Sequence, residues 1–299
     1  MIRIFYELRF VEPRSRYGKQ MQLDFDALKA RLIEHLQQIA RPRDPFLASE
    51  GHFFVRQYVR EQLAQWGAIE VHAFTYQGRT HENFILNLPG TRSTLPILVG
   101  AHFDAIPGTA GADDNATGVA VLLELARSIS QMPARSPIRF AAFDLEEYGL
   151  LGSRAYANQL QEPLKLMLSL EMLGYCDRRP QSQNYPAKLQ YLYPNHGDFI
   201  ALIGNWRSSL NLLRITFSLR RSGVPAQLLP AGDRGLFLPT IRRSDHAPFW
   251  DLGYPAILVT DTGDLRNPHY HQPSDRLETI DLDFLTRVCA GLTASLRYL

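Results

Sequence analysis

Four short apolar runs, separated by segments of other patterning, constrain the fold of this chain more than any other feature. They are PILVGAH (96–102), IRFAAFD (138–144), LKLMLSLEM (164–172) and PAILVTD (255–261). Continuous apolar runs of this length are typical of strands that are buried on both faces of a parallel sheet. Two further segments, IEVHAFTY (69–76) and ENFILNL (82–88), are predicted to form paired strands.

Segments with helical patterning lie between and around these runs. The predicted helices are 25–40, a second that starts at Ser49 as its cap and runs to Gly67, 115–131 and 281–299. Alternating strands and helices predict an α/β fold with a largely parallel, helix-flanked sheet. Because no internal repeat or low-complexity linker is found, we expect a single domain over residues 1–299. The polar stretches 177–186 and 228–243 are predicted surface loops.

Charge and composition exclude several classes of partner. The 32 Lys and Arg nearly balance the 30 Asp and Glu, so we expect neither nucleic acid nor a membrane as the main partner. Charges at Arg3, Glu7 and Arg9 interrupt the apolar core that a signal peptide needs, and no stretch approaches the ~20 apolar residues of a membrane span. Cys176 and Cys289 are too few for a disulfide framework. We expect a soluble, cytoplasmic protein.

Polar residues directly after the buried strands are the candidates for a site, because ligands bind at the carboxyl ends of strands in such sheets. Strand alternation places His102 and Asp104 on the same side, where Asp104 can orient the imidazole of a metal ligand. The alternative is a half-buried histidine beside a solvated aspartate. Asp113 and Asp114 precede a predicted helix, and helix capping accounts for one of them but not for both.

Further carboxylates follow the next two strands. Glu146 and Glu147 form either a solvated turn or, where the chain leaves extended geometry, a pair in which one binds metal and the other moves protons. Glu171 interrupts a buried run and needs a partner to stay ionised, unless the strand leaves for solvent there. His269 and His271 flank Tyr270 in NPHYHQPSD (267–275), which is weak evidence by itself.

Taken together, five strand-end segments supply imidazole, carboxylate, carboxylate, carboxylate and imidazole, all of which suit Zn²⁺. Three ionised ligand carboxylates set against two divalent ions leave one positive charge. Metal ions bound there would stabilise the aspartates that are crowded in the stretch GAHFDAIPGTAGADDNATG (100–118).

These segments closely resemble the M28 family of zinc-dependent aminopeptidases. The matching pieces, in the order of the family, are HFD (102–104), GADDNATG (111–118), DLEEYGLLGS (144–153), LSLEMLGY (168–175), SDHAPF (244–249) and NPHYHQPSD (267–275). They extend over more than half of the chain and are specific as a set.

The resemblance implies a three-layer αβα sandwich around a mixed, mostly parallel eight-stranded sheet, with two zinc ions per chain. It assigns Asp114 as the bridging ligand, His102 and Glu171 to one zinc, Glu147 and His271 to the other, Glu146 as general base and Tyr270 as a hydrogen-bond donor to the tetrahedral intermediate. Asp104 joins Glu146 and Tyr270 as a candidate of the catalytic machinery. The family more often has Asp at the position of Glu171.

Other residues of the matching motifs have weaker predictions. His246 is expected to line the substrate site or support the ligands, and not to bind metal; Ser244 is expected to cap a short helix. Arg242 and Arg243 either meet a substrate carboxylate or are merely solvated.

The predicted function is hydrolysis of N-terminal peptide bonds in a peptide substrate. A serine hydrolase is disfavoured because no G-x-S-x-G motif is present. Two alternatives stay open: a glutaminyl-peptide cyclotransferase, which has the same fold with one zinc, and a non-catalytic relative that has lost its metals. The sequence does not determine the preferred N-terminal residue or the oligomeric state.

Overall fold

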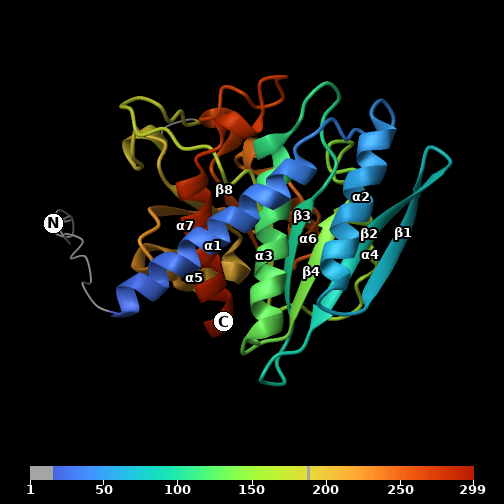
Figure 1. Cartoon of the computed structure of the whole chain (residues 1–299), viewed down its shortest axis with the longest axis horizontal. Helices are drawn as coiled ribbons and strands as arrows, with labels where there is room; N and C mark the ends of the chain where they lie inside the picture. The colour runs from blue at the N-terminus through green and yellow to red at the C-terminus, as the bar shows by residue number, and fades with distance from the viewer. Residues whose placement is uncertain (1–15, 187–188) are drawn as a thin grey trace.

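One mixed sheet of eight strands forms the centre of the described chain, residues 16–186 and 189–299, in this computed structural model (Figure 1). The strands are β1 (Ile69–Tyr76), β2 (Arg79–Leu88), β3 (Ile97–His102), β4 (Ile138–Phe143), β5 (Leu166–Glu171), β6 (Ile200–Gly204), β7 (Ala226–Pro230) and β8 (Ala256–Thr260). Their order across the sheet is β1-β2-β4-β3-β5-β8-β6-β7. β4, β3, β5 and β8 run parallel, whereas β1–β2, β2–β4 and β6–β8 are antiparallel pairs. The predicted α/β fold with a mixed, mostly parallel sheet is confirmed.

Helices cover both faces of this sheet. They are α1 (Arg16–Ile39), α2 (Ser49–Ala64), α3 (Gly118–Gln131), α4 (Leu151–Gln159), α5 (Ser209–Arg221), α6 (His246–Asp251) and α7 (Leu282–Tyr298). Apolar side chains of α1, α2, α3, α5 and α7 share one core cluster, and those of α4 and α6 share another. Figure 1 shows α1 lying across α3 and α7.

The strand residues divide between these two clusters by alternation. In β3, which is buried along its whole length, Val99 packs in the first cluster and Leu98 in the second. This is the period of two expected of a strand, and burial on both faces explains the unbroken apolar runs in the sequence.

Strands β6 and β7 and helices α4 and α5 were not predicted from the sequence patterns. β7 occupies residues 226–230, so the prediction of a surface loop over 228–243 is wrong at its start. The strand is short, lies at the sheet edge and is only partly buried, and such strands carry little apolar patterning.

Two helices begin differently from the prediction. α2 begins at Ser49, but its N-cap is Ala48 and no side chain caps it, so the predicted Ser49 cap is wrong. α1 begins at Arg16, earlier than the predicted residue 25.

The parallel strands bring their carboxyl ends to one edge of the sheet, as predicted. His102 ends β3 and Glu171 ends β5, while Asp144 directly follows β4. No helix of the described residues is both long and apolar enough to cross a membrane. Residues 1–15, on which the expectation about a signal peptide rested, lie outside the described residues. Cys289 is buried, Cys176 is partly buried, and both are free thiols.

Candidate metal centre

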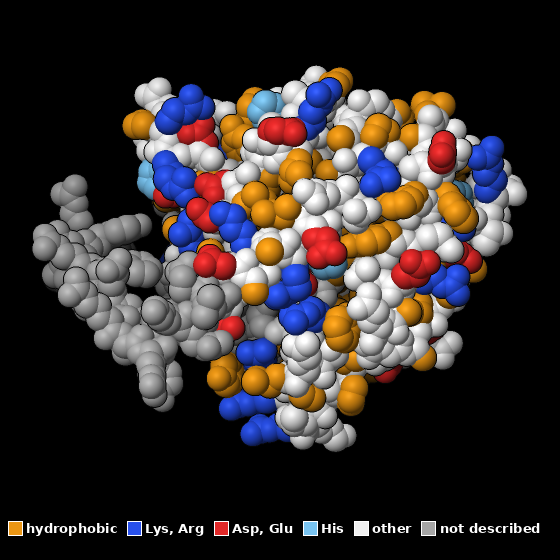
Figure 2. All heavy atoms as spheres, in the orientation of Figure 1, with side chains coloured by type: hydrophobic (Ala, Val, Ile, Leu, Met, Phe, Trp, Pro, Cys, Tyr) orange, Lys and Arg blue, Asp and Glu red, His pale blue; other side chains and the backbone are white. Residues whose placement is uncertain are grey.

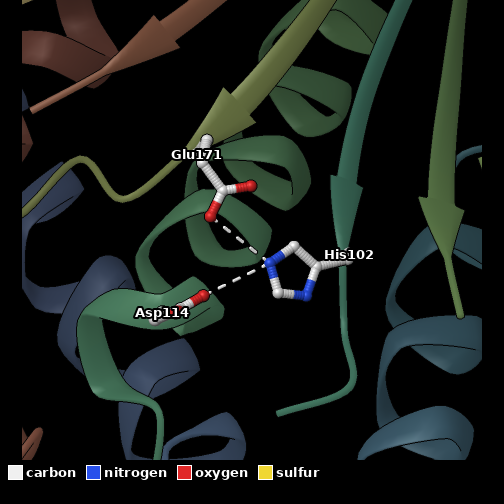
Figure 3. Close-up of side chains that lie close together, drawn as sticks. All are labelled: His102, Asp114 and Glu171. Atoms are coloured by element: carbon white, nitrogen blue, oxygen red, sulfur yellow. Dashed lines mark hydrogen bonds and ion pairs between the residues drawn. The ribbon is translucent and has the colours of Figure 1, made fainter. Parts of the chain in front are cut away.

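A first group of possible metal ligands lies where β3 and β5 end. Nε2 of His102 is 3.4 Å from Oδ1 of Asp114 and 3.4 Å from Oε1 of Glu171. Figure 3 shows the imidazole directed between the two carboxylates, with His102 and Glu171 on neighbouring strands and Asp114 on the turn before α3. One ligand atom from each residue lies within 4.8 Å of the other two.

A second group shares Asp114 with the first. Nε2 of His271 is 3.1 Å from Oδ2 of Asp114 and 3.4 Å from Oε2 of Glu147, and the ligand atoms of this group also lie within 4.8 Å of one another. The two oxygens of Asp114 therefore face two different imidazoles. That is the arrangement a carboxylate needs to bridge two ions.

The backbone of Asp114 is held from two directions. The carboxylate of Asp275 accepts hydrogen bonds from the main-chain N–H of Asp113 at 2.9 Å and of Asp114 at 3.1 Å. From the other side, the fully buried guanidinium of Arg43 donates to the carbonyl of Asp114 at 3.3 Å and to that of Gly111 at 2.8 Å. The Asp114–Asn115 peptide bond is cis. These contacts set the direction in which the Asp114 side chain leaves the turn.

Asp113 points away from this centre. Its carboxylate accepts hydrogen bonds from the N–H of Gly174 at 2.9 Å and from Asn267 at 2.7 Å. Neither aspartate caps α3, so that expectation is wrong. The N-cap is Thr117, whose side chain makes no capping bond, and Oδ1 of Asn115 accepts a hydrogen bond from the N–H of Gly118, the first residue of the helix, at 3.1 Å.

Asp104 connects His102 to the two adjacent glutamates. Its Oδ1 is 3.3 Å from Nδ1 of His102, and its two oxygens accept hydrogen bonds from the N–H of Glu146 at 3.1 Å and of Glu147 at 3.2 Å. Asp104 is completely buried, so the alternative of a solvated aspartate is wrong. Leu145 has φ 58°, a left-handed conformation, so the chain leaves extended geometry directly before the two glutamates. Glu146 and Glu147 therefore leave the turn in different directions.

Glu146 lies close to both groups without belonging to either. Its Oε2 is 4.0 Å from Nε2 of His102, and the residue is 7% exposed. Tyr270 stacks on the imidazole of His271 with ring centroids 3.8 Å apart, which places its phenol at the same centre.

The electrostatics show an excess of buried negative charge. Burial, together with the Glu171 and Glu147 carboxylates, raises the pKa of Glu146 well above its usual range. Burial and Asp114 raise the pKa of Glu147 to about 7. Although burial opposes it, hydrogen bonds to Asp114 and Glu147 raise the pKa of His271 to about 10. The two imidazoles thus do not neutralise the surrounding carboxylates, and a mixed imidazole–carboxylate set of this charge suits Zn²⁺.

The motif around Ser244 serves a different purpose from the predicted one. Ser244 does not cap α6; its hydroxyl donates to Oε2 of Glu171 at 2.8 Å. His246 is fully buried, and its Nε2–H donates to the carbonyl of Ile241 at 2.8 Å. It supports the loop and lies in neither ligand group. Arg242 pairs with Asp251 at 2.8 Å, and Arg243 pairs with Asp264.

A pocket opens beside Glu171 and Tyr270. Apolar side chains line much of it, namely Met172, Ile203, Ile241, Leu258 and Leu265. Arg243 lies at its wall, with its guanidinium 5.8 Å from the ring centroid of Tyr270. The centre is therefore adjacent to a space that suits an apolar group.

Three residues of the centre were missed in the sequence. Asp245, whose pKa burial raises to about 7, is one of the carboxylates that raise the pKa of Glu146, and Asp275 holds the Asp114 turn. Both belong to matching motifs, SDHAPF and NPHYHQPSD, which were the available signal. Arg43 had no such signal, because it lies far before the motifs in the chain.

Comparisons with known proteins were consistent with this geometry. Residues 83–200 and 230–295 match the model of peptidase family M28. The chain is 34% identical to the uncharacterized protein YfbL of Escherichia coli K12, over 97% of this chain and 92% of that protein.

Two solved structures are also similar. BSAP, a zinc aminopeptidase from Bacillus subtilis, is 26% identical with a TM-score of 0.54, over 74% of this chain but only 50% of that one. A glutaminyl cyclase from Macrostomum lignano is 18% identical with a TM-score of 0.71, over 96% of this chain and 94% of that one. This second likeness is one of fold alone.

Proposed function

This chain belongs to peptidase family M28, and from that premise we propose that it is a two-zinc aminopeptidase that hydrolyses the N-terminal bond of peptides. The observation that carries the proposal is the position of Asp114 between His102 and His271. A relative that had lost its metals would have no need of two ligand groups that share one carboxylate.

The ligand roles follow from the two groups. His102 and Glu171 would hold one ion, Glu147 and His271 the other, and Asp114 both. Zinc ions bound there would polarise the scissile carbonyl and lower the pKa of a water molecule.

The remaining side chains have proton-transfer and positioning roles. Glu146 has its carboxylate near the shared centre and outside both ligand groups, so it is free to accept the proton of the attacking water and deliver it to the leaving amine. Tyr270, beside His271, donates a hydrogen bond to the oxygen that becomes negative in the tetrahedral intermediate. Asp104 keeps His102 and the Glu146 turn in place.

The similarity to BSAP supports cleavage at the amino terminus, and the apolar pocket beside Glu171 and Tyr270 is placed to receive the first side chain of the substrate. The test is to measure zinc per chain together with hydrolysis of matched peptides with free and acetylated amino termini. Two zinc ions per chain and cleavage of the free peptide alone are expected. Full activity after removal of metal would contradict the proposal.

The same measurement separates the alternatives. One tightly bound zinc, with cyclisation of N-terminal glutamine in place of hydrolysis, would identify a cyclotransferase. A chain that binds no zinc and transforms neither substrate would be the non-catalytic relative that has lost its metals.

A further inference from the structure

The solvent side of α5 is apolar, which the fold does not explain. Trp206, in the turn before the helix, is 56% exposed, and Leu210, Leu213 and Phe217 are 61%, 56% and 67% exposed. Their spacing of four, three and four residues places them in one stripe along the helix. The opposite side of α5 already packs into the core through Leu212, Ile215 and Leu219. A contiguous exposed apolar stripe of this kind marks an interaction site.

A row of cations runs beside this stripe. Arg207, Arg214 and Arg221 repeat every seven residues, and no acidic residue occurs between 206 and 221. We call the stripe and this row together the α5 face. One carboxylate contacts the α5 face: Asp233 accepts a hydrogen bond from the indole of Trp206 at 2.7 Å.

The positive charge continues beyond the helix. Burial lowers the pKa of Lys165, and the positive charges of Arg214, Arg135 and Arg92 lower it further. Figure 2 shows Lys and Arg side chains interspersed with hydrophobic ones at the lower edge of the molecule, around the carboxyl terminus. Lys165 contacts the carbonyl of Leu299 at that terminus. The cationic surface is therefore broader than one helix.

Charge argues against a second copy of the chain as the partner. When two identical helices pair in antiparallel fashion, each flanking row faces the same row of its partner. The arginine row would meet itself, with no acid on α5 to compensate. An anionic partner is favoured instead, and Trp, Leu and Phe beside arginines are the side chains of helices that lie in a lipid interface.

We infer that the α5 face binds an anionic lipid surface peripherally. β6 is antiparallel to β8, and Gly204 at its end pairs with Ile257 near the start of β8. Trp206 therefore lies at the opposite end of the sheet from His102 and Glu171. From there α5 runs back along the sheet to β7, whose first residue pairs with the first residue of β6, so only the Trp206 end of the α5 face is remote from the candidate metal centre. The inference does not depend on the proposed peptidase activity.

The test is flotation of the full chain with vesicles of phosphatidylcholine alone or mixed with phosphatidylglycerol. We expect binding to the mixed vesicles only, reduced by added salt. Replacing two arginines together, Arg207→Glu and Arg214→Glu, should weaken binding by about tenfold or more. The pair Leu213→Ser and Phe217→Ser should weaken it by about tenfold or more as well, through loss of the apolar anchor.

Matched controls are Arg60→Glu, an exposed cation of α2, and Leu192→Ser, an exposed leucine before β6. Both should bind vesicles as the parent does. No binding to either vesicle, equal binding to both, or equal loss in the controls would overturn the inference. Sedimentation provides an independent check: a parent dimer that Leu213→Ser with Phe217→Ser converts to monomer would assign the α5 face to a second copy instead.

Discussion

Asp104 lies 3.3 Å from the imidazole of His102 and also accepts hydrogen bonds from the main-chain N–H groups of Glu146 at 3.1 Å and Glu147 at 3.2 Å. One buried carboxylate thus fixes both a proposed zinc ligand and the turn that carries the proposed base. The two functions are coupled through a residue that belongs to neither ligand group.

Asp104→Asn should therefore impair both functions at once. The amide keeps the volume of the side chain, but its NH₂ group would face one of the two main-chain N–H groups from which the carboxylate accepts hydrogen bonds. It also lacks the negative charge that lies beside the imidazole of His102. We expect zinc affinity to fall by about 10- to 100-fold and kcat to fall with it. Zinc titration against a competing chelator and steady-state kinetics measure the two effects. Parent values for both would show that Asp104 has no part in positioning.

Glu146 and Glu147 should separate into base and ligand. Glu146→Gln removes the proton acceptor and keeps the shape, so it should retain both zinc ions while kcat falls by about 10²- to 10⁴-fold. Glu147→Gln should release metal, since its carboxylate lies 3.4 Å from His271 in the second ligand group. Zinc per chain and kcat for each variant are the readouts. The reverse pattern would exchange the two roles.

Asp114 and Asp113 provide a matched pair of neighbours. Asp114→Asn should lower zinc content below one ion per chain and abolish activity, because both ligand groups share this carboxylate. Asp113→Asn should leave two sites in place, since Asp113 contacts Gly174 and Asn267 instead. Metal analysis after equilibrium dialysis tests this. Equal losses in the two variants would argue against a bridging role for Asp114.

His246 predicts a specific pH dependence of stability. Burial lowers its pKa from 6.5 to about 3, so between these values the unfolded chain binds a proton that the folded chain does not. The free energy of unfolding therefore falls as the pH is lowered from 6.5 toward 3, by about 1.4 kcal/mol per pH unit from this histidine alone. Above pH 6.5 His246 causes no such loss.

The control is His246→Gln, which keeps a donor for the carbonyl of Ile241 but cannot titrate. Urea unfolding of the metal-free proteins at pH 7, 6 and 5 should give a shallower loss of stability for the variant than for the parent. Equal slopes would mean that His246 is able to take up a proton in the folded state.

Much of the site was accessible from the sequence because its chemistry is local. Unbroken apolar runs such as ILVGAH indicate buried strands, and a carboxylate such as Glu171 can be recognised because it interrupts one of these runs. Parallel strands then bring such residues to one edge whatever the loops do.

By itself the sequence determined the α/β class, the strands at the centre of the sheet and the types of ligand at their ends. The family resemblance had already assigned Asp114 and not Asp113 as the bridging ligand. Only the tertiary structure showed that the two oxygens of Asp114 face two imidazoles, that Asn115 accepts from the first N–H of α3 and that Ser244 supports Glu171. The reason is physical. Burial leaves a periodic pattern in the chain, but the direction of a side chain in a turn depends on backbone contacts made by distant residues, here Arg43 and Asp275, which local patterning does not encode.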